Sequence, residues 1–349
     1  MKTKRRMMIL TEGRLGIFSS KTAVSLIRYR SGETACVLDS RAAATGKGLE
    51  EFIGGIGRGI PIVKSVREGL RCRPTQLLIG IAPVGGQLPA AWRRIIMEAL
   101  AAGLEIVSGL HQMLGEDQQF AALARKKKVR IWDVRQMPEH LDVAHDRLRS
   151  LRQRRIALVG SDCNLGKMIT ALELDRGLRE AGYDSEFIAT GQTGIMIAGS
   201  GLALDHVISD FVNGAMEQLC WERRRRQVVV IEGQGSVFHP AYSGVTVGML
   251  HGAMPHAIVY QHAPWRKRIH HYEQFKIPPL RQGIQLVEDL IRPLQRTKVV
   301  AIGLNTVGQK DSEAMRAMKR IEDETGLPAA DPIRHGVEKL VRAVEKSVL

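Results

Sequence analysis

The chain has few cysteines, few aromatic residues and no long apolar segment. Its cysteines, Cys36, Cys72, Cys163 and Cys220, are widely spaced and form no C-x-x-C pair, which argues against a disulfide framework or a structural zinc site. No apolar segment reaches the roughly 18 residues that a membrane helix needs, and the apolar stretch after the basic N-terminus is too short for a secretion signal. We therefore expect a cytoplasmic protein that does not bind membranes.

Acidic residues are also scarce relative to basic ones, since 51 Lys and Arg against 36 Asp and Glu give a formal net charge of +15. A field of this sign concentrates anionic partners near the surface. Only 5% of residues are aromatic and no DNA- or RNA-binding motif accompanies the basic residues, so a small anionic substrate is favoured over nucleic acid. The basic run from Arg223 to Arg226 is interpreted as the solvated end of a helix before a strand.

The first half of the chain alternates between strand-like and helix-like segments. Strands are predicted over 7–11, 35–39, 77–82, 104–108 and 129–133, and helices over 21–29 and 90–102, with a loop over 83–89. This alternation predicts a parallel, doubly wound α/β sheet. The glycines at 13–16 and 54–57 form only partial dinucleotide-binding fingerprints, so we interpret both segments as turns.

The second half repeats the same alternation after a charged segment over 137–154, which contains Pro138 and predicts a helical or irregular connector. A length of 349 residues suits two domains, and we place them at 1–136 and 155–349. In the second, strands are predicted over 156–159, 185–189, 228–231, 257–260 and 299–302, and helices after Gly166 and over 210–222, 311–325 and 337–346.

A strand running into a glycine-bounded turn and then a lysine is the most informative feature of this half. Glycines let backbone N–H groups converge on an anion, the following helix points its positive end at it, and the lysine adds charge. The loop is one residue longer than the usual motif, and a methionine replaces the magnesium-binding Ser or Thr. We predict a phosphate site that involves Ser161, Asp162, Asn164, Leu165, Gly166, Lys167, Met168 and Thr170.

Metal binding by this loop remains open, because Thr170 lies three residues past Lys167 on the same helix, so its hydroxyl faces nearly the same side as the lysine and can substitute for the missing one. Further glycine-rich segments follow predicted strands and are expected to share the same crevice. Glu232 ends one of those strands, where a carboxylate can hold a cation, orient water, accept a proton or simply cap a turn. The segments contribute candidate substrate-binding residues: Thr190, Gly191, Gln192, Gln234, Gly235 and Ser236.

Several of these segments resemble known families. The loop at 160–167, the acidic-glycine turn at 232–235 and the late Asn305 are similar to the dethiobiotin synthetase group of P-loop proteins. More closely, the chain from about Thr11 onward resembles a two-domain family associated with D-glutamate N-acetyltransferase, chiefly through residues 231–252 and also through 103–111 and 21–40. The resemblance implies a Rossmann-like N-terminal domain, a P-loop NTPase-like C-terminal domain, and acetyl transfer from acetyl-CoA to D-glutamate, with Asn305 near the cofactor.

Acetyl-CoA would account for the unusual loop, because phosphates of coenzyme A can be held without magnesium. Acetyl transfer needs a base, for which Glu232 and His239 are the candidates. Cys163 offers a second mechanism through an acetyl-thioester, if its place near a helix N-terminus lowers its pKa. A carboxylate of the substrate needs a cationic partner, and Arg266 is the candidate.

Other hypotheses remain open at this stage. The loop can bind Mg-ATP, with Asp162 and Glu232 holding the metal, as in a ligase or kinase of the dethiobiotin synthetase type. A nucleotide-sensing regulatory protein is the non-enzymatic alternative. The adjacent His270 and His271 do not share a helical face, and we predict no dedicated metal site. We also expect a homo-oligomer.

Overall fold

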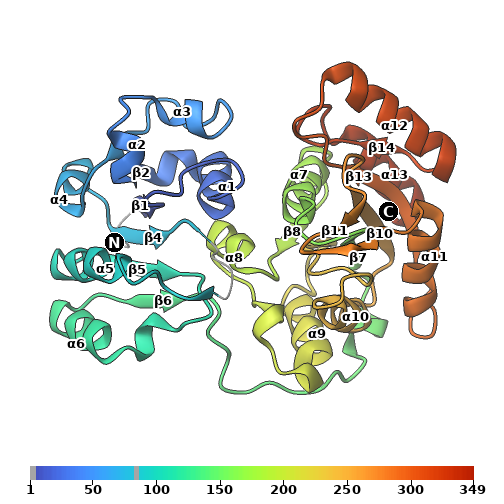
Figure 1. Cartoon of the computed structure of the whole chain (residues 1–349). Coiled ribbons are helices and arrows are strands. Elements are labelled where there is room, and N and C mark those ends of the chain that lie inside the picture. The colour runs from blue at the N-terminus through green and yellow to red at the C-terminus, as the bar shows by residue number, and fades with distance from the viewer. Residues whose placement is uncertain (1–4, 82–85) are drawn as a thin grey trace. The chain divides into compact units, whose positions relative to one another are not determined.

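The computed structural model describes residues 5–81 and 86–349, and the chain divides into two compact units (Figure 1). The N-terminal unit comprises residues 1–136 together with 195–199, and the C-terminal unit comprises 137–194 and 200–349. The loop predicted over 83–89 and the end of the strand predicted over 77–82 lie partly outside the described residues. Within the described ranges, no helix is both long and apolar enough to cross a bilayer.

The N-terminal unit is built on a six-stranded parallel sheet, as predicted. Its strand order is β3-β2-β1-β4-β5-β6, the order of a Rossmann fold. Both faces of the sheet are covered, which is why a central strand such as β1 is buried along its whole length. The strands are β1 (Met7–Leu10), β2 (Thr34–Leu38), β3 (Ile62–Val63), β4 (Gln76–Ile79), β5 (Glu105–Ser108) and β6 (Ile131–Asp133).

The helices of this unit bury apolar side chains such as Ile96 and Phe120 against the sheet. Asp39 follows β2, where many dinucleotide-binding folds place an acidic residue. Its carboxylate accepts hydrogen bonds from Thr11 Oγ1, Leu15 N and Ala42 N, and therefore serves the fold itself. The helices are α1 (Lys21–Arg30), α2 (Ser40–Ala43), α3 (Leu49–Phe52), α4 (Val66–Gly69), α5 (Trp92–Ala101) and α6 (Gln118–Lys127).

The C-terminal unit holds a second six-stranded parallel sheet, of order β14-β13-β10-β7-β9-β8. Strand β7 lies between β10 and β9, so the loops that follow these strands meet at one edge. A short antiparallel hairpin, β11 (Arg268–Ile269) and β12 (Tyr272–Lys276), follows β10. The sheet strands are β7 (Arg154–Gly160), β8 (Ser185–Ile188), β9 (Val228–Ile231), β10 (Ala257–His262), β13 (Lys298–Leu304) and β14 (Ala329–Ala330).

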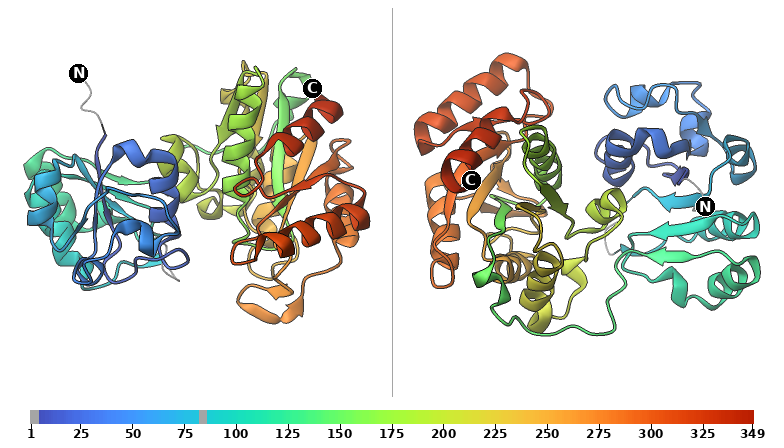
Figure 2. Two further views of the ribbon diagram at one scale, coloured as in Figure 1. Left: turned by 90° about the horizontal axis from the view of Figure 1, so that it is seen from above. Right: turned by 180° about the vertical axis from the view of Figure 1, so that it is seen from behind.

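Helices cover both faces of this sheet (Figure 2). Helix α10 packs beside α9, and buried Met249 and Leu250 of α10 join the core formed by β7, β9 and β10. Both sheets confirm the predicted fold class of two α/β units. The helices of this unit are α7 (Lys167–Glu180), α9 (Val212–Glu222), α10 (Ser243–Ala253), α11 (Leu280–Ile291), α12 (Asp311–Thr325) and α13 (Glu338–Val348). Helix α8 (Gln192–Ala198) begins in this unit, but its residues from 195 onward belong to the N-terminal unit.

The basic run after α9 is not simply solvated, contrary to the interpretation of its sequence. The side chain of Arg223 is only 10% exposed, and its Nε lies 2.9 Å from a carboxylate oxygen of Glu186. Arg226 pairs with the same residue at 2.8 Å and with Asp184 at 2.7 Å. The run therefore neutralises acidic residues at the start of β8.

Candidate functional site

The loop between β7 and α7 has the geometry of an anion-binding turn. Asn164 and Gly166 have positive φ angles of 53° and 101°, and α7 begins at Lys167. Among the residues that the structure describes, no hydrogen bond uses the N–H groups of Asn164, Leu165 or Gly166. The first turn of a helix leaves further N–H groups unpaired, so these donors together can receive a phosphate.

Lys167 connects this loop to the loop after β9. Its Nζ donates to the carbonyl oxygens of Asp162 at 2.8 Å and Gly235 at 2.7 Å. Burial lowers the pKa of Lys167 to about 8, so the amine remains mostly charged at neutral pH. Gly233 passes close below it, and a Cβ there would overlap the carbonyl oxygen of Leu158. The lysine is thus held where an anion in the loop would meet it.

Asp162 is buried and ties the loop to the segment after β10. Its Oδ1 accepts the N–H of Cys163 at 2.7 Å. Its Oδ2 accepts Nη1 of Arg266 at 3.1 Å and the N–H of His270 at 2.8 Å. Nη1 of Arg266 also donates to the carbonyl oxygen of Cys163 at 2.8 Å. Arg266 therefore anchors the loop, and its hydrogen bonds to the loop use Nη1 alone.

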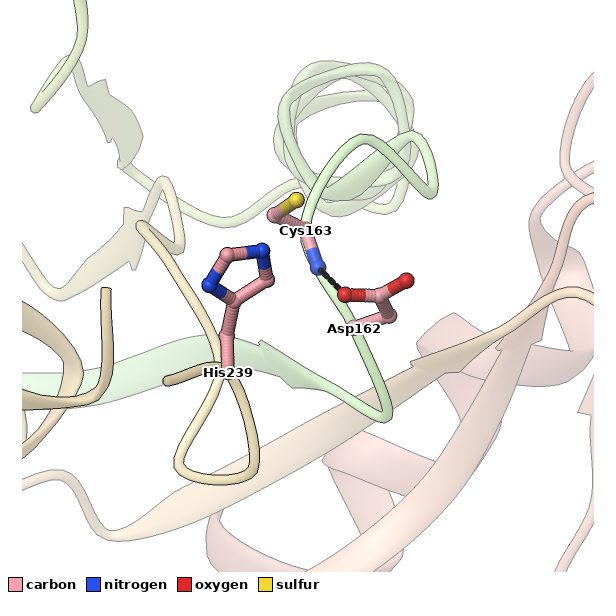
Figure 3. Close-up of side chains that lie close together, drawn as sticks. All are labelled: Asp162, Cys163 and His239. Atoms are coloured by element: carbon pink, nitrogen blue, oxygen red, sulfur yellow. Dashed lines mark hydrogen bonds between the residues drawn. The ribbon is translucent and has the colours of Figure 1, made fainter. Parts of the chain in front are cut away.

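His239 lies next to Asp162 and Cys163 (Figure 3), and donor atoms of the three side chains lie within 4.8 Å of one another. Nδ1 of His239 accepts the N–H of Ala241 at 3.2 Å, so Nε2 carries the proton and donates to the carbonyl oxygen of His270 at 3.1 Å. Because both ring nitrogens and both Asp162 oxygens have partners, this cluster holds neighbouring loops together.

Cys163 does not have the electrostatic environment that its sequence position indicated. Burial, followed by the nearby carboxylate of Asp162, raises the pKa of the thiol to about 11. The expected lowering is therefore wrong, because α7 starts only at Lys167 and the thiol is excluded from solvent. A nucleophilic role for Cys163 stays a prediction that this environment does not favour.

Glu232 follows β9 and is almost fully buried. Its Oε2 accepts the N–H groups of Thr190 at 2.9 Å and Gly191 at 3.1 Å. Its other oxygen, Oε1, accepts no hydrogen bond from any described residue. Burial raises the pKa of Glu232 to about 7, although the two N–H groups oppose this shift. Glu232 thus combines one fixed oxygen, one available oxygen and a pKa near neutrality.

Thr170 lies beneath the loop rather than in it. Its hydroxyl donates to Oε1 of Gln261 at 2.7 Å, and Nε2 of Gln261 donates to the carbonyl oxygen of Leu165 at 3.2 Å. Nδ2 of Asn305 donates to the same carbonyl at 3.1 Å. Thr170 and Asn305 therefore support the backbone of the loop, whereas Met168 is half-buried at the start of α7.

Comparison with known proteins agrees with this architecture. A family described as the P-loop domain DUF1611_C, a domain of unknown function, matches residues 142–341, and one described as the Rossmann-like domain DUF1611_N matches 42–137. The chain belongs to the DUF1611 family. Both predicted domain types are confirmed.

Two curated proteins are similar to this chain over most of its length. A D-glutamate N-acetyltransferase from Tritonibacter scottomollicae is 39% identical over 77% of this chain and 80% of its own, and one from Pseudoalteromonas sp. is 36% identical over 79% and 83%. A crystal structure of a DUF1611 protein from Anabaena variabilis is 38% identical, with a TM-score of 0.92 over 98% of this chain and 99% of that one. The family resemblance seen in the sequence is confirmed.

The remaining predicted residues of this DUF1611 protein also lie around the loops. Ser161 Oγ and His262 Nδ1 are 2.8 Å apart, and Gln234 Nε2 donates to Thr190 Oγ1 at 3.2 Å. Ser236 is buried and receives the N–H of Phe238 on its hydroxyl. Gln192 begins α8, directly after Gly191. Sequence reasoning did not select Gln261 or His262, although both end the strand beside β7.

The Asp162–Arg266 pair should contribute strongly to the stability of the DUF1611 fold. We expect Asp162→Ala to lower the free energy of unfolding by about 3–5 kcal/mol, because it leaves a guanidinium only 12% exposed without its partner. Glu98→Ala removes an exposed pair with Arg94 at 3.5 Å and should cost less than about 1 kcal/mol. Urea unfolding of both variants measures the difference, and equal losses would contradict the anchoring role of Asp162.

Proposed function

We propose that the protein is an N-acetyltransferase that transfers the acetyl group of acetyl-CoA to the amine of D-glutamate. The observation that carries this proposal is Glu232, whose Oε1 is available, whose pKa is about 7 and whose loop is bonded to Lys167 through Gly235. The candidate base and the candidate anion site thus lie on adjacent, hydrogen-bonded loops. The names of the two curated relatives support the choice of reaction and acceptor.

In the proposed reaction, Glu232 accepts a proton from the ammonium group of D-glutamate and so produces the free amine. The amine nitrogen attacks the thioester carbonyl, a C–N bond forms and the C–S bond breaks. The nitrogen then loses a second proton, which balances the charge of the departing coenzyme A thiolate. Glu232 suits the first step better than His239, since both ring nitrogens of His239 are bonded to the backbone.

The phosphates of coenzyme A are proposed to lie on the N–H groups of the loop and on Lys167. Magnesium prefers a set of several oxygen ligands, and of the candidate ligands only Glu232 keeps a carboxylate oxygen without a partner among the described residues. Met168 offers a thioether, the Thr170 hydroxyl donates to Gln261, and Asp162 is paired with Arg266. We therefore assign no step to a metal. Nε and Nη2 of Arg266 make no hydrogen bond to any described residue and are proposed to meet a substrate carboxylate.

A direct assay tests this function. Enzyme mixed with acetyl-CoA and D-glutamate is expected to release free thiol and N-acetylglutamate in equal amounts, with the rate unchanged by EDTA. L-glutamate and buffer without acceptor serve as controls. Thiol release that needs no acceptor would indicate hydrolysis, and turnover only with Mg-ATP would replace the proposal with the ligase or kinase hypothesis.

A further inference from the structure

A groove of about 590 Å³ lies in the C-terminal unit, beside the start of α9 and α10. Ligand sites commonly have volumes of about 300–1,000 Å³. The two helices lie side by side (Figure 1), and glycine allows this approach, because a Cβ at Gly248 would lie only 2.6 Å from Cγ1 of Val212. The walls combine apolar side chains with hydrogen-bonding ones in similar number, among them Leu204, Val207, Val245, Ser209, Asn213 and Ser243.

The segments that form the groove are hydrogen-bonded to the two loops around Glu232. On one side, the N–H of Leu204 donates to the carbonyl oxygen of Thr190 at 3.0 Å, and the N–H of Thr190 donates to Glu232. On the other, the hydroxyl of Thr246 donates to the carbonyl oxygen of Gln234 at 2.7 Å. The groove therefore borders the loops that hold the proposed base, and Glu232 itself lies outside its lining.

The loop after β9 also connects the groove to the anion site. The carbonyl oxygen of Gly235 accepts Nζ of Lys167, and a Cβ at Gly235 would lie 3.1 Å from Cγ1 of Val245 in the groove wall. A ligand with phosphates at one end and a reactive group some distance away could thus follow this loop from Lys167 to Glu232. Such a ligand needs a linker that is neither anionic nor bulky.

The chemistry of the walls selects the kind of linker. In the described part of the chain, no Lys or Arg lines the groove, whereas Asp205 does. Asp205 is also close enough to Glu232 to contribute to its raised pKa. A dicarboxylate such as glutamate would be repelled here, since it needs cationic partners. A neutral chain with amide groups fits, because the valines contact its methylenes while Ser209, Asn213 and Ser243 meet its amides.

We propose that this groove binds the pantetheine arm of acetyl-CoA and leads its thioester to Glu232. The inference rests on the proposed function. It assigns a site to the acyl donor and leaves the acceptor to enter from the side of Arg266.

Gly244 allows a sharp test. It lines the groove at the start of α10, has no positive φ, and a Cβ placed on it meets no atom within 4 Å. Gly244→Leu should therefore fill the groove without disturbing the backbone, and Gly244→Ala should fill it less. Gly32 is a matched control, because its Cβ would also meet nothing within 4 Å and it lies in the other unit.

Calorimetric titration compares coenzyme A with adenosine 3′,5′-bisphosphate, which lacks the pantetheine arm. Gly244→Leu is expected to weaken coenzyme A binding about tenfold or more, Gly244→Ala less, and Gly32→Leu not at all. Binding of the bisphosphate should change less than about twofold in every variant. Circular dichroism verifies that the variants are folded.

Other outcomes decide against the proposal in distinguishable ways. Equal weakening of both ligands, or of neither, would show that the groove does not hold the arm. A raised KM for D-glutamate with unchanged coenzyme A binding would assign the groove to the acceptor. If the wild-type protein binds no coenzyme A at all, the proposed function itself fails, and the groove assignment fails with it.

Discussion

Glu232→Gln is expected to lower kcat/KM for acetyl transfer about 100- to 10,000-fold, the usual contribution of a positioned general base. The substitution keeps an oxygen that can accept the N–H groups of Thr190 and Gly191, so the loops should keep their arrangement. Only the ability to take a proton is lost. Coenzyme A binding, measured by calorimetry, should therefore remain close to that of the wild type.

The matched control for this variant is Glu288→Gln. Glu288 is also a buried carboxylate in the C-terminal unit and also accepts a backbone N–H, that of Val299 at 3.0 Å, but it lies on α11. Its variant should retain full activity. If Glu232→Gln turns over at the wild-type rate, Glu232 is not the base and His239 becomes the candidate.

The pH dependence of both activity and stability follows from the same carboxyl group. The wild-type rate should rise with pH through about 7 as Glu232 ionises, and this limb should vanish in Glu232→Gln. Between the ordinary glutamate pKa of 4.5 and the raised pKa of about 7, the Glu232 carboxyl group binds more protons in the folded protein than in the unfolded chain. The free energy of unfolding that Glu232 contributes therefore falls as the pH rises through this range. Glu232→Gln should remove this decline in thermal unfolding measurements.

Lys167→Ala is expected to weaken coenzyme A binding by roughly 10- to 150-fold, since hydrogen bonds to charged groups contribute about 1.5–3 kcal/mol. The amine is buried and faces the loop, so water cannot easily replace it. Because its pKa is about 8, wild-type affinity should also fall as pH rises above that value. Calorimetric titrations at pH 7 and pH 9 measure both effects.

Lys319→Ala is the control, because Lys319 is an exposed lysine on α12 whose loss changes the net charge by the same amount. It should bind coenzyme A almost as tightly as the wild type. If Lys167→Ala and Lys319→Ala behave alike, the loop between β7 and α7 does not hold the phosphates.

Much of the fold could be predicted from the sequence, because alternating apolar strands and amphipathic helices dictate a parallel α/β sheet. The prediction located α12 and β9 with the bounds that the structure has. It missed α10, whose Gly244, Gly248 and Gly252 lower intrinsic helix propensity. Gly248 and Gly252 allow close packing against α9, a tertiary gain that no local pattern reports. The prediction also missed the strands β3 and β14, because strands of two residues are too short to show a periodic pattern in the sequence.

The candidate site was predictable in its parts but not in its connections. The strand, glycine and lysine pattern located the loop, and the run before Glu232 located the carboxylate. That Arg266 pairs with Asp162 depends on residues 104 positions apart, and no spacing rule reaches across that separation. Likewise, the support of Leu165 by Gln261 depends on β10 lying next to β7.

The turn of the β11–β12 hairpin has a consequence for anyone who alters this protein. The backbone N–H of His270 donates to Asp162, and its carbonyl oxygen accepts Nε2 of His239. The turn therefore links the loop after β7 to the loop after β9. An affinity tag or a peptide inserted at exposed His271 would therefore loosen both loops at once. Surface position alone is therefore a poor guide to where this chain tolerates an insertion.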